Sequence, residues 1–171
     1  GYVASSVEAL AGQVDTATIT GGLFPMLARR YDQQAAKIRW PAYAQPKLDG
    51  PRCIITVTGG TASMWSRTRK PITSMPHILA RVQELVRRGN LADGEALDGE
   101  LYNNDYHNRF EELTHFIRQG APIPGSELIQ YHAYDAVIPG DFTQRYQALR
   151  ALLSGQPASS PIRLVETLHV T

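Results

Sequence analysis

The sequence predicts a mixed α+β domain with antiparallel sheets flanked by helices. Segments rich in β-branched residues alternate along the chain with segments whose apolar residues recur at helical spacing. Gly59-Gly60 stands between two of the strand-like segments, and a two-residue turn of this kind joins antiparallel strands. The length of 171 residues fits one domain that can bury a core of its own.

The chain begins with a segment of weak pattern. Residues 1–21 are rich in Ala, Ser, Thr and Gly, and we expect them to form a loose lead-in to a domain covering residues 22–171. Apolar residues at helical spacing then predict a helix over about 25–37. Two prolines, Pro41 and Pro46, favour an extended segment after this helix.

The other elements follow from the same two patterns. The predicted strands cover residues 53–58, 61–67, 97–102, 128–137 and about 162–169. The predicted helices cover residues 76–88, 109–119 and 142–153. We expect Ser74 or Thr73 to cap the helix over 76–88 and Gly89 to end it.

The composition predicts a water-soluble protein of the cell interior. Hydrophobic residues make up 43% of the chain and charged residues 19%, and the net charge of +1 indicates no strongly basic or acidic surface. Cys53 is the only cysteine, which excludes an internal disulfide and a zinc site built on several thiolates. No apolar run approaches the roughly 18–20 residues that span a bilayer. The first residues lack a basic signal-peptide start, so we predict an intracellular protein.

The most informative segment is Lys47-Leu48-Asp49-Gly50-Pro51-Arg52. A lysine attacks phosphorus only as the neutral amine, which desolvation and neighbouring cations favour. Glycine accepts unusual dihedral angles and proline presets φ, so Gly50-Pro51 predicts a tight reversal. The reversal would bring Arg52 near Lys47, where a guanidinium can hold a phosphate or sugar oxygen.

Three later segments offer complementary groups. Ser66-Arg67-Thr68 supplies a hydroxyl and a second guanidinium, and Asp98 and Glu100 stand at i and i+2 on one predicted strand. The segment from Tyr131 to Asp135 places aromatic rings on another strand, where one could stack on a base. An amine, phosphate-binding cations, an acid and a ring are the parts that nucleotidyl transfer through a covalent lysine adduct requires.

In this order the four motifs resemble the nucleotidyltransferase domain of ATP-dependent DNA ligases. That family belongs to a superfamily that includes RNA ligases and mRNA capping enzymes. The lead-in from Trp40 to Pro46 resembles the phage and bacterial enzymes, and the resemblance covers roughly Met26 to Thr171. It implies the α+β fold of a ligase adenylation domain, which is ATP-grasp-like, with a nucleotide cleft between antiparallel sheets.

The resemblance also implies a reaction. Lys47 would attack the α-phosphate of ATP, release pyrophosphate and form lysyl-AMP, with Mg²⁺ neutralising charge. The AMP would pass to the 5′-phosphate of nicked duplex DNA, and the 3′-hydroxyl would then seal the strand. Such an enzyme serves DNA replication, repair and recombination. We expect a monomer without membrane contacts, in a bacterial cytoplasm or a virus-infected cell.

By the same resemblance, Arg52 and Arg67 would contact the sugar and phosphate of the nucleotide or the 5′-phosphate of the nick. Glu100 would hold the ribose and help place the metal ion. Tyr134 would stack on adenine. Gln45 and Pro46 would lie beside the base.

The chain departs from the family pattern in three places. Gln45 stands where many DNA ligases carry Glu, which puts the base contact in doubt. Tyr134 stands where Phe is frequent, which keeps a stacking ring. The sequence stops at Thr171, before the later acidic and lysine-rich motifs and before the C-terminal OB-fold domain. We therefore expect weak adenylation and weak nick sealing from these residues alone.

Several alternatives remain. The four motifs also suit an RNA ligase, a capping-type guanylyltransferase that uses GTP, or a non-catalytic module that binds nucleotide or nucleic acid. Lys47 can be read as a surface lysine before a turn. Asp98 can be read as a group that only orients the backbone or an arginine, and Tyr134 as core packing.

Overall fold

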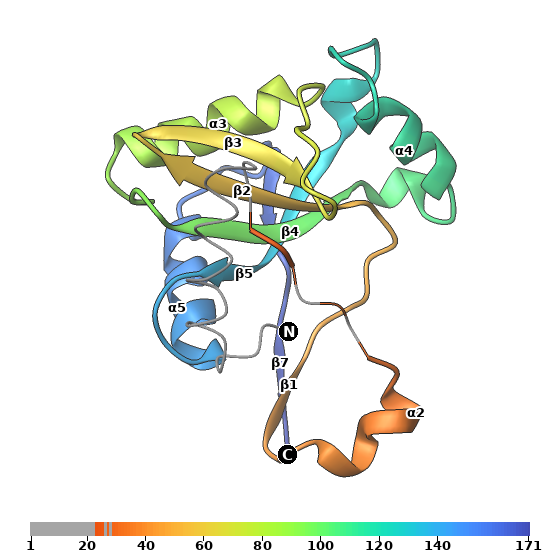
Figure 1. Cartoon of the computed structure of the whole chain (residues 1–171), viewed down its shortest axis with the longest axis vertical. Helices are drawn as coiled ribbons and strands as arrows, with labels where there is room; N and C mark the ends of the chain where they lie inside the picture. Colours follow the sequence, from red (N-terminus) through yellow and green to blue (C-terminus); the bar gives the residue numbers. More distant parts are fainter. Residues whose placement is uncertain (1–22, 26, 28) are drawn as a thin grey trace.

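A five-stranded sheet forms the centre of the molecule (Figure 1). The computed structural model describes residues 23–25, 27 and 29–171. The strands run in the order β3-β2-β4-β5-β6, and each neighbouring pair is antiparallel except β5 and β6, which are parallel. Their bounds are Arg52–Thr58 for β2, Thr61–Ser66 for β3, Ala96–Tyr102 for β4, Gln130–Val137 for β5 and Ile162–Leu164 for β6. This arrangement confirms the predicted α+β class with largely antiparallel sheets.

A second, two-stranded sheet lies apart from the first (Figure 1). It pairs β1 (Ala42–Ala44) with β7 (Leu168–Val170) in antiparallel register. The extended segment predicted between the two prolines is therefore a strand. The single strand predicted over 162–169 is wrong, because β6 and β7 belong to different sheets. Strand propensity shows only that a segment is extended and not which sheet it joins.

Three α-helices of eight or more residues form in the described part of the chain, and the first and last of them pack against strands of the main sheet. They are α3 (Pro76–Arg87), α4 (Phe110–Ile117) and α5 (Phe142–Leu153), close to the predicted ranges. The helix predicted over 25–37 is shorter: among the described residues of this range, only α2 (Tyr31–Gln34) and the 3₁₀ turn η2 (Ala35–Lys37) form. Neither buries a residue, so no apolar face stabilises a longer helix. Two further 3₁₀ turns are η3 (Asn104–Tyr106) and η4 (Ser126–Leu128). The expectation for residues 1–21 lies outside the described residues.

The predicted cap of α3 is wrong in an informative way. The residue before α3 is Met75, which makes no side-chain cap bond, and Pro76 needs no acceptor for a backbone N–H. The hydroxyl of Ser74 instead donates to the carbonyl of Ile117 at 2.8 Å, and that of Thr73 donates to the carbonyl of Gly120 at 2.8 Å. Both hydroxyls thus tie the start of α3 to the end of α4.

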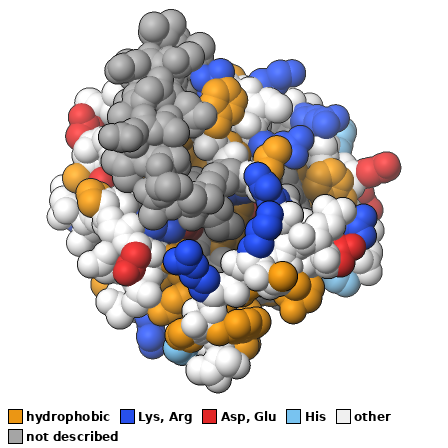
Figure 2. Space-filling view, turned by 60° about the horizontal axis from the view of Figure 1, so that its bottom comes forward, with side chains coloured by type: hydrophobic (Ala, Val, Ile, Leu, Met, Phe, Trp, Pro, Cys, Tyr) orange, Lys and Arg blue, Asp and Glu red, His pale blue; other side chains and the backbone are white. Residues whose placement is uncertain are grey.

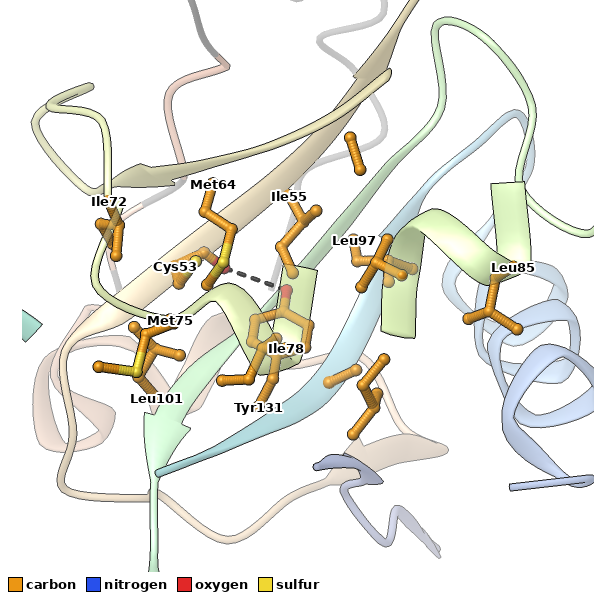
Figure 3. Packing of buried hydrophobic residues seen from close by; sticks show 14 of the residues in the cluster. Cys53, Ile55, Met64, Ile72, Met75, Ile78, Leu85, Leu97, Leu101 and Tyr131 are labelled. Carbon is orange, nitrogen blue, oxygen red and sulfur yellow. Dashed lines mark hydrogen bonds between the residues drawn. The ribbon is translucent and has the colours of Figure 1, made fainter. Parts of the chain in front are cut away.

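One face of the sheet carries the main core (Figure 3). Ile78 and Leu85 of α3 point toward the strands, where Ile55 is fully buried. Tyr131 is also fully buried, and its hydroxyl donates to the carbonyl of Cys53 at 3.1 Å. Burial raises the pKa of the Cys53 thiol, so this cysteine is a protonated core residue.

The register between β4 and β5 shifts between Asp98 and Gly99. A Cβ atom at Gly99 would lie 2.5 Å from the carbonyl oxygen of His132 and 2.8 Å from the ring of Tyr131. Any larger residue would push the two strands apart. Gly99 is therefore required by close packing. The residue skipped by the shift is Tyr134 of β5, whereas Asp98 and Glu100 stand at i and i+2 on β4, and all three line one cavity.

Leu23, at the start of the described chain, covers part of the opposite face of the sheet. Leu23 packs there with Ile54 and Ala96 in a smaller buried cluster. Arg52 lies two residues before Ile54 on β2 and therefore points to this same face.

None of the helices in the described part of the chain has the length and apolar character that a membrane-spanning helix needs.

Candidate nucleotide-binding site

A cavity of about 1260 Å³ opens on this second face. The space-filling view shows Lys and Arg side chains gathered around a hollow, with Asp and Glu toward the edge (Figure 2). The cavity brings together all seven residues that the motifs predicted, namely Gln45, Pro46, Lys47, Arg52, Arg67, Glu100 and Tyr134.

Lys47 lies in the loop between β1 and β2, and contacts with β4 hold this loop in place. The carbonyl of Pro51 accepts a hydrogen bond from the N–H of Leu101 at 2.9 Å. A Cβ atom at Gly50 would lie 2.2 Å from the carbonyl oxygen of Leu101. Gly50 does not have a positive φ, so close approach and not an unusual dihedral angle requires glycine here. These contacts place Lys47 beside Glu100, and the positive charge of Lys47 acts to lower the pKa of the Glu100 carboxyl group.

Lys47 is an exposed residue along the cavity wall. The described residues therefore do not exclude water from its amine, and the desolvation expected from the sequence is not found in this part of the chain. Acid, arginine and aromatic groups nevertheless share the cavity with it.

Arg52 is held by a buried acid. Its Nε donates to Oδ1 of Asp98 at 3.0 Å and its Nη2 to Oδ2 at 2.5 Å, and Asp98 is completely buried. The guanidinium also lies 5.6 Å from the ring centroid of Tyr134. Two of the guanidinium donors are thus committed to Asp98, which has the arginine-orienting role that the sequence left open.

Glu100 lies at the centre of the polar wall. The hydroxyl of Tyr134 donates to its Oε2 at 3.3 Å. Burial raises the pKa of Glu100 to about 7, although the N–H of Gly50, the hydroxyl of Tyr134 and the charges of Arg52 and Lys47 oppose the rise. Burial therefore favours the neutral form of this carboxyl group.

Tyr134 and Gln45 form the other end of this wall. Burial is also the main reason that the pKa of Tyr134 is raised, which keeps its hydroxyl a donor. The side-chain nitrogen of Gln45 donates to the backbone carbonyl of Tyr134 at 2.9 Å and to Oγ1 of Thr167 at 2.8 Å. No local pattern singles out Thr167, because its contact depends on a partner 122 residues away in the sequence.

Further cations and a helix complete the cavity. Arg67, Lys70 and Arg118 line it and are exposed. Phe110, at the start of α4, also lines it and is 43% exposed. The motifs did not predict the contribution of α4, because a helix wall needs only a mixed polar and apolar face and no special residue pattern.

The described residues contain no group of three His, Cys, Asp or Glu side chains that could hold a metal ion by themselves. Of the two acids on β4, Asp98 is paired with Arg52, which leaves Glu100. A third acid that lines the cavity, Asp135, is paired with Arg145. Glu100, which is in no salt bridge with a described residue, fits Mg²⁺, because Mg²⁺ commonly keeps several waters and binds nucleotide phosphates with one or two protein carboxylates.

The sheet, the lysine loop and the cavity define a nucleotidyltransferase-type domain. The family model described as ATP dependent DNA ligase domain matches residues 25–171. The chain belongs to the ATP-dependent DNA ligase domain family. No curated protein sequence matches it.

Solved structures show the same fold. One named Pmar-Lig_Pre has a TM-score of 0.71 at 17% identity, over 83% of this chain and 34% of its own. A Lig E DNA ligase structure, from a study of DNA binding with a minimal scaffold, has a TM-score of 0.61 at 21% identity, over 86% and 52%. The ATP-dependent DNA ligase of bacteriophage T7 in complex with ATP has a TM-score of 0.54 at 19% identity, over 86% and 55%. The chain thus spans between 34% and 55% of these proteins.

Proposed function

We propose that this domain performs the adenylation step of an ATP-dependent DNA ligase, with Lys47 as the residue that becomes covalently modified. The observation that carries the proposal is the convergence of seven residues, spread from position 45 to position 134, on one cavity. The family membership and the T7 ligase structure in complex with ATP support ATP as the nucleotide.

In the proposed first step, the neutral Nζ of Lys47 attacks the α-phosphorus of ATP. A P–N bond forms, the bond from the α-phosphorus to the pyrophosphate oxygen breaks, and one proton leaves the amine. The AMP then passes to the 5′-phosphate at a nick in duplex DNA, and attack by the 3′-hydroxyl releases AMP. Alignment and charge neutralisation supply most of the rate in such transfers.

Each wall of the cavity suits one part of the nucleotide. Tyr134 offers a ring for the base, and Glu100 offers a carboxyl group for the ribose. Arg67, Lys70 and Arg118 offer positive charge for phosphates. Glu100 would also be the protein ligand of Mg²⁺, which supplies further charge neutralisation when it is bound.

The exposure of Lys47 bears on how fast the chain reacts. A bound triphosphate would displace water from the amine, but the described residues do not do so beforehand. We therefore expect slow adenylation that favours single-turnover detection. The same exposure favours a second candidate, a module of this fold that binds nucleotide without reacting.

Labelled nucleotides test the proposal. The chain is incubated with α-labelled ATP or GTP and then separated by denaturing electrophoresis. We expect label from ATP to remain on the protein, to be absent from Lys47→Arg, and to persist in Lys37→Arg, a control in η2 outside the cavity. Label from GTP instead of ATP would indicate a capping-type enzyme. Binding of ATP without any adduct would indicate the non-catalytic module. Nicked DNA and nicked RNA substrates then separate a DNA ligase from an RNA ligase.

A further inference from the structure

The side-chain amide of Gln45 is fixed in one orientation. Its nitrogen lies 2.9 Å from the backbone carbonyl oxygen of Tyr134 and 2.8 Å from Oγ1 of Thr167. A carbonyl oxygen can only accept, so the atom that faces it must be the NH₂ group. An amide NH₂ has two hydrogens, and both are used by these two acceptors.

Thr167 is arranged to accept this bond. Its hydroxyl hydrogen is directed to the carbonyl oxygen of Val165, at 3.4 Å, which leaves the hydroxyl oxygen for Gln45. Thr167 lies between β6 and β7, the two strands that join different sheets. The connection between the sheets therefore holds the amide in place.

The side-chain oxygen of Gln45, Oε1, is not held by the protein in the same way. Oε1 of Gln45 makes no hydrogen bond to any described residue, and it is not among the buried side-chain atoms that lack a partner. Gln45 lines the cavity beside Tyr134. The amide thus offers the cavity an acceptor, while its donors are occupied by the protein.

We propose that Thr167 is a positioning residue that, together with the backbone carbonyl of Tyr134, sets base selectivity by keeping the oxygen of Gln45 toward the nucleotide. This inference rests on the proposed function. An acceptor at this place favours a base with an amino group, such as adenine, over one that presents a carbonyl oxygen there. A carboxylate presents an acceptor in either orientation, but an amide does so only if it is prevented from turning over.

Equilibrium binding tests the role of Thr167 without requiring catalysis. The probes are ATP and purine riboside triphosphate, which lacks the 6-amino group. We expect the unaltered chain to bind ATP about tenfold more tightly, as one hydrogen bond allows. Thr167→Val keeps the side-chain shape without the hydroxyl. The amide of Gln45 then keeps only its bond to the carbonyl of Tyr134, so we expect the ratio of the two dissociation constants to fall in part, to about threefold. Thr167→Ser restores the hydroxyl and should restore the ratio.

A second measurement examines the amide alone. In a ¹⁵N–¹H spectrum, the two NH₂ protons of Gln45 should exchange slowly with water in the unaltered chain and in Thr167→Ser. One of them should exchange faster in Thr167→Val. Rapid exchange of both protons in the unaltered chain would overturn the inference, even if every variant folded poorly.

The outcomes also separate this inference from the proposed function. If ATP binds and the ratio is the same in Thr167→Val as in the unaltered chain, the role of Thr167 is wrong and the adenylation proposal stands. If the unaltered chain binds neither nucleotide, the adenylation proposal fails and the selectivity proposal fails with it. A ratio that falls in Thr167→Val and recovers in Thr167→Ser supports both.

Discussion

Replacing Glu100 by glutamine should change how the stability of the domain depends on pH. Glu100 is largely buried beside Tyr134 and Gly50, and burial raises its pKa from 4.5 to about 7. Because the folded protein holds this proton more tightly than the unfolded chain does, the folded state loses stability as pH rises from 4.5 to above 7. Glutamine has nearly the same shape and keeps one acceptor oxygen, but it has no charge to desolvate.

The magnitude follows from the shift. A difference between 4.5 and about 7 corresponds to roughly 3 kcal/mol against the ionised form. Because Glu100 borders an open cavity, solvent screening reduces this to about 2 kcal/mol. The free energy of unfolding of Glu100→Gln, relative to that of the unaltered chain, should therefore rise by about 2 kcal/mol between pH 4.5 and pH 8. Near pH 4.5 the two proteins should differ little.

Urea unfolding at a series of pH values measures this difference directly. Glu111→Gln is the control for loss of one negative charge, because Glu111 is exposed on α4 and does not line the cavity. The free energy of unfolding of Glu100→Gln is compared with that of the unaltered chain at each pH. If the difference stays constant with pH, or shrinks as pH rises, burial of this carboxyl group is not the cause of its raised pKa.

Two further changes test the packing around the site. Arg52→Ala should destabilise the domain by about 3–5 kcal/mol, because Asp98 is completely buried and would lose its cationic partner, and Arg52→Ala/Asp98→Asn should recover part of that loss in the same urea experiment. Ser74→Ala should cost about 1–2 kcal/mol in thermal or urea unfolding, because the buried carbonyl of Ile117 would lose its donor, whereas an effect below about 0.5 kcal/mol would contradict the tie between α3 and α4.

The elements that local chemistry determines could be predicted. The hairpin of β2 and β3 follows from β-branched residues around Gly59-Gly60, and the positive φ of both glycines fits such a turn. The helix α3 ends as predicted near Gly89, which has a φ of +74°. These features depend on residues that are close in sequence, so a single sequence carries the whole signal.

Features that depend on distant partners could not be predicted. Residues 162–169 look like one strand, yet Leu168 pairs with Ala44 in a second sheet. Ser74 has the properties of a helix cap, but a carbonyl 43 residues away takes its hydroxyl hydrogen. The competing partner is visible only after the chain has folded.

The candidate site shows the same division. The motifs identified residue types that suit a nucleotide, and all seven line one cavity. They did not show that Asp98 occupies two donors of Arg52, that Lys47 is exposed, or that Thr167 holds Gln45. Each of these facts depends on the register of β2 and β4 or on the path between β6 and β7.

The central claim is that Lys47 accepts AMP from ATP. Mass spectrometry of the intact chain after incubation with ATP and Mg²⁺, followed by peptide mapping, tests it most directly. The account predicts a fraction of the protein heavier by one AMP, with the modification on the peptide that contains Lys47, and no such fraction in Lys47→Ala. An AMP adduct on another residue, or one that persists in Lys47→Ala, would contradict the account.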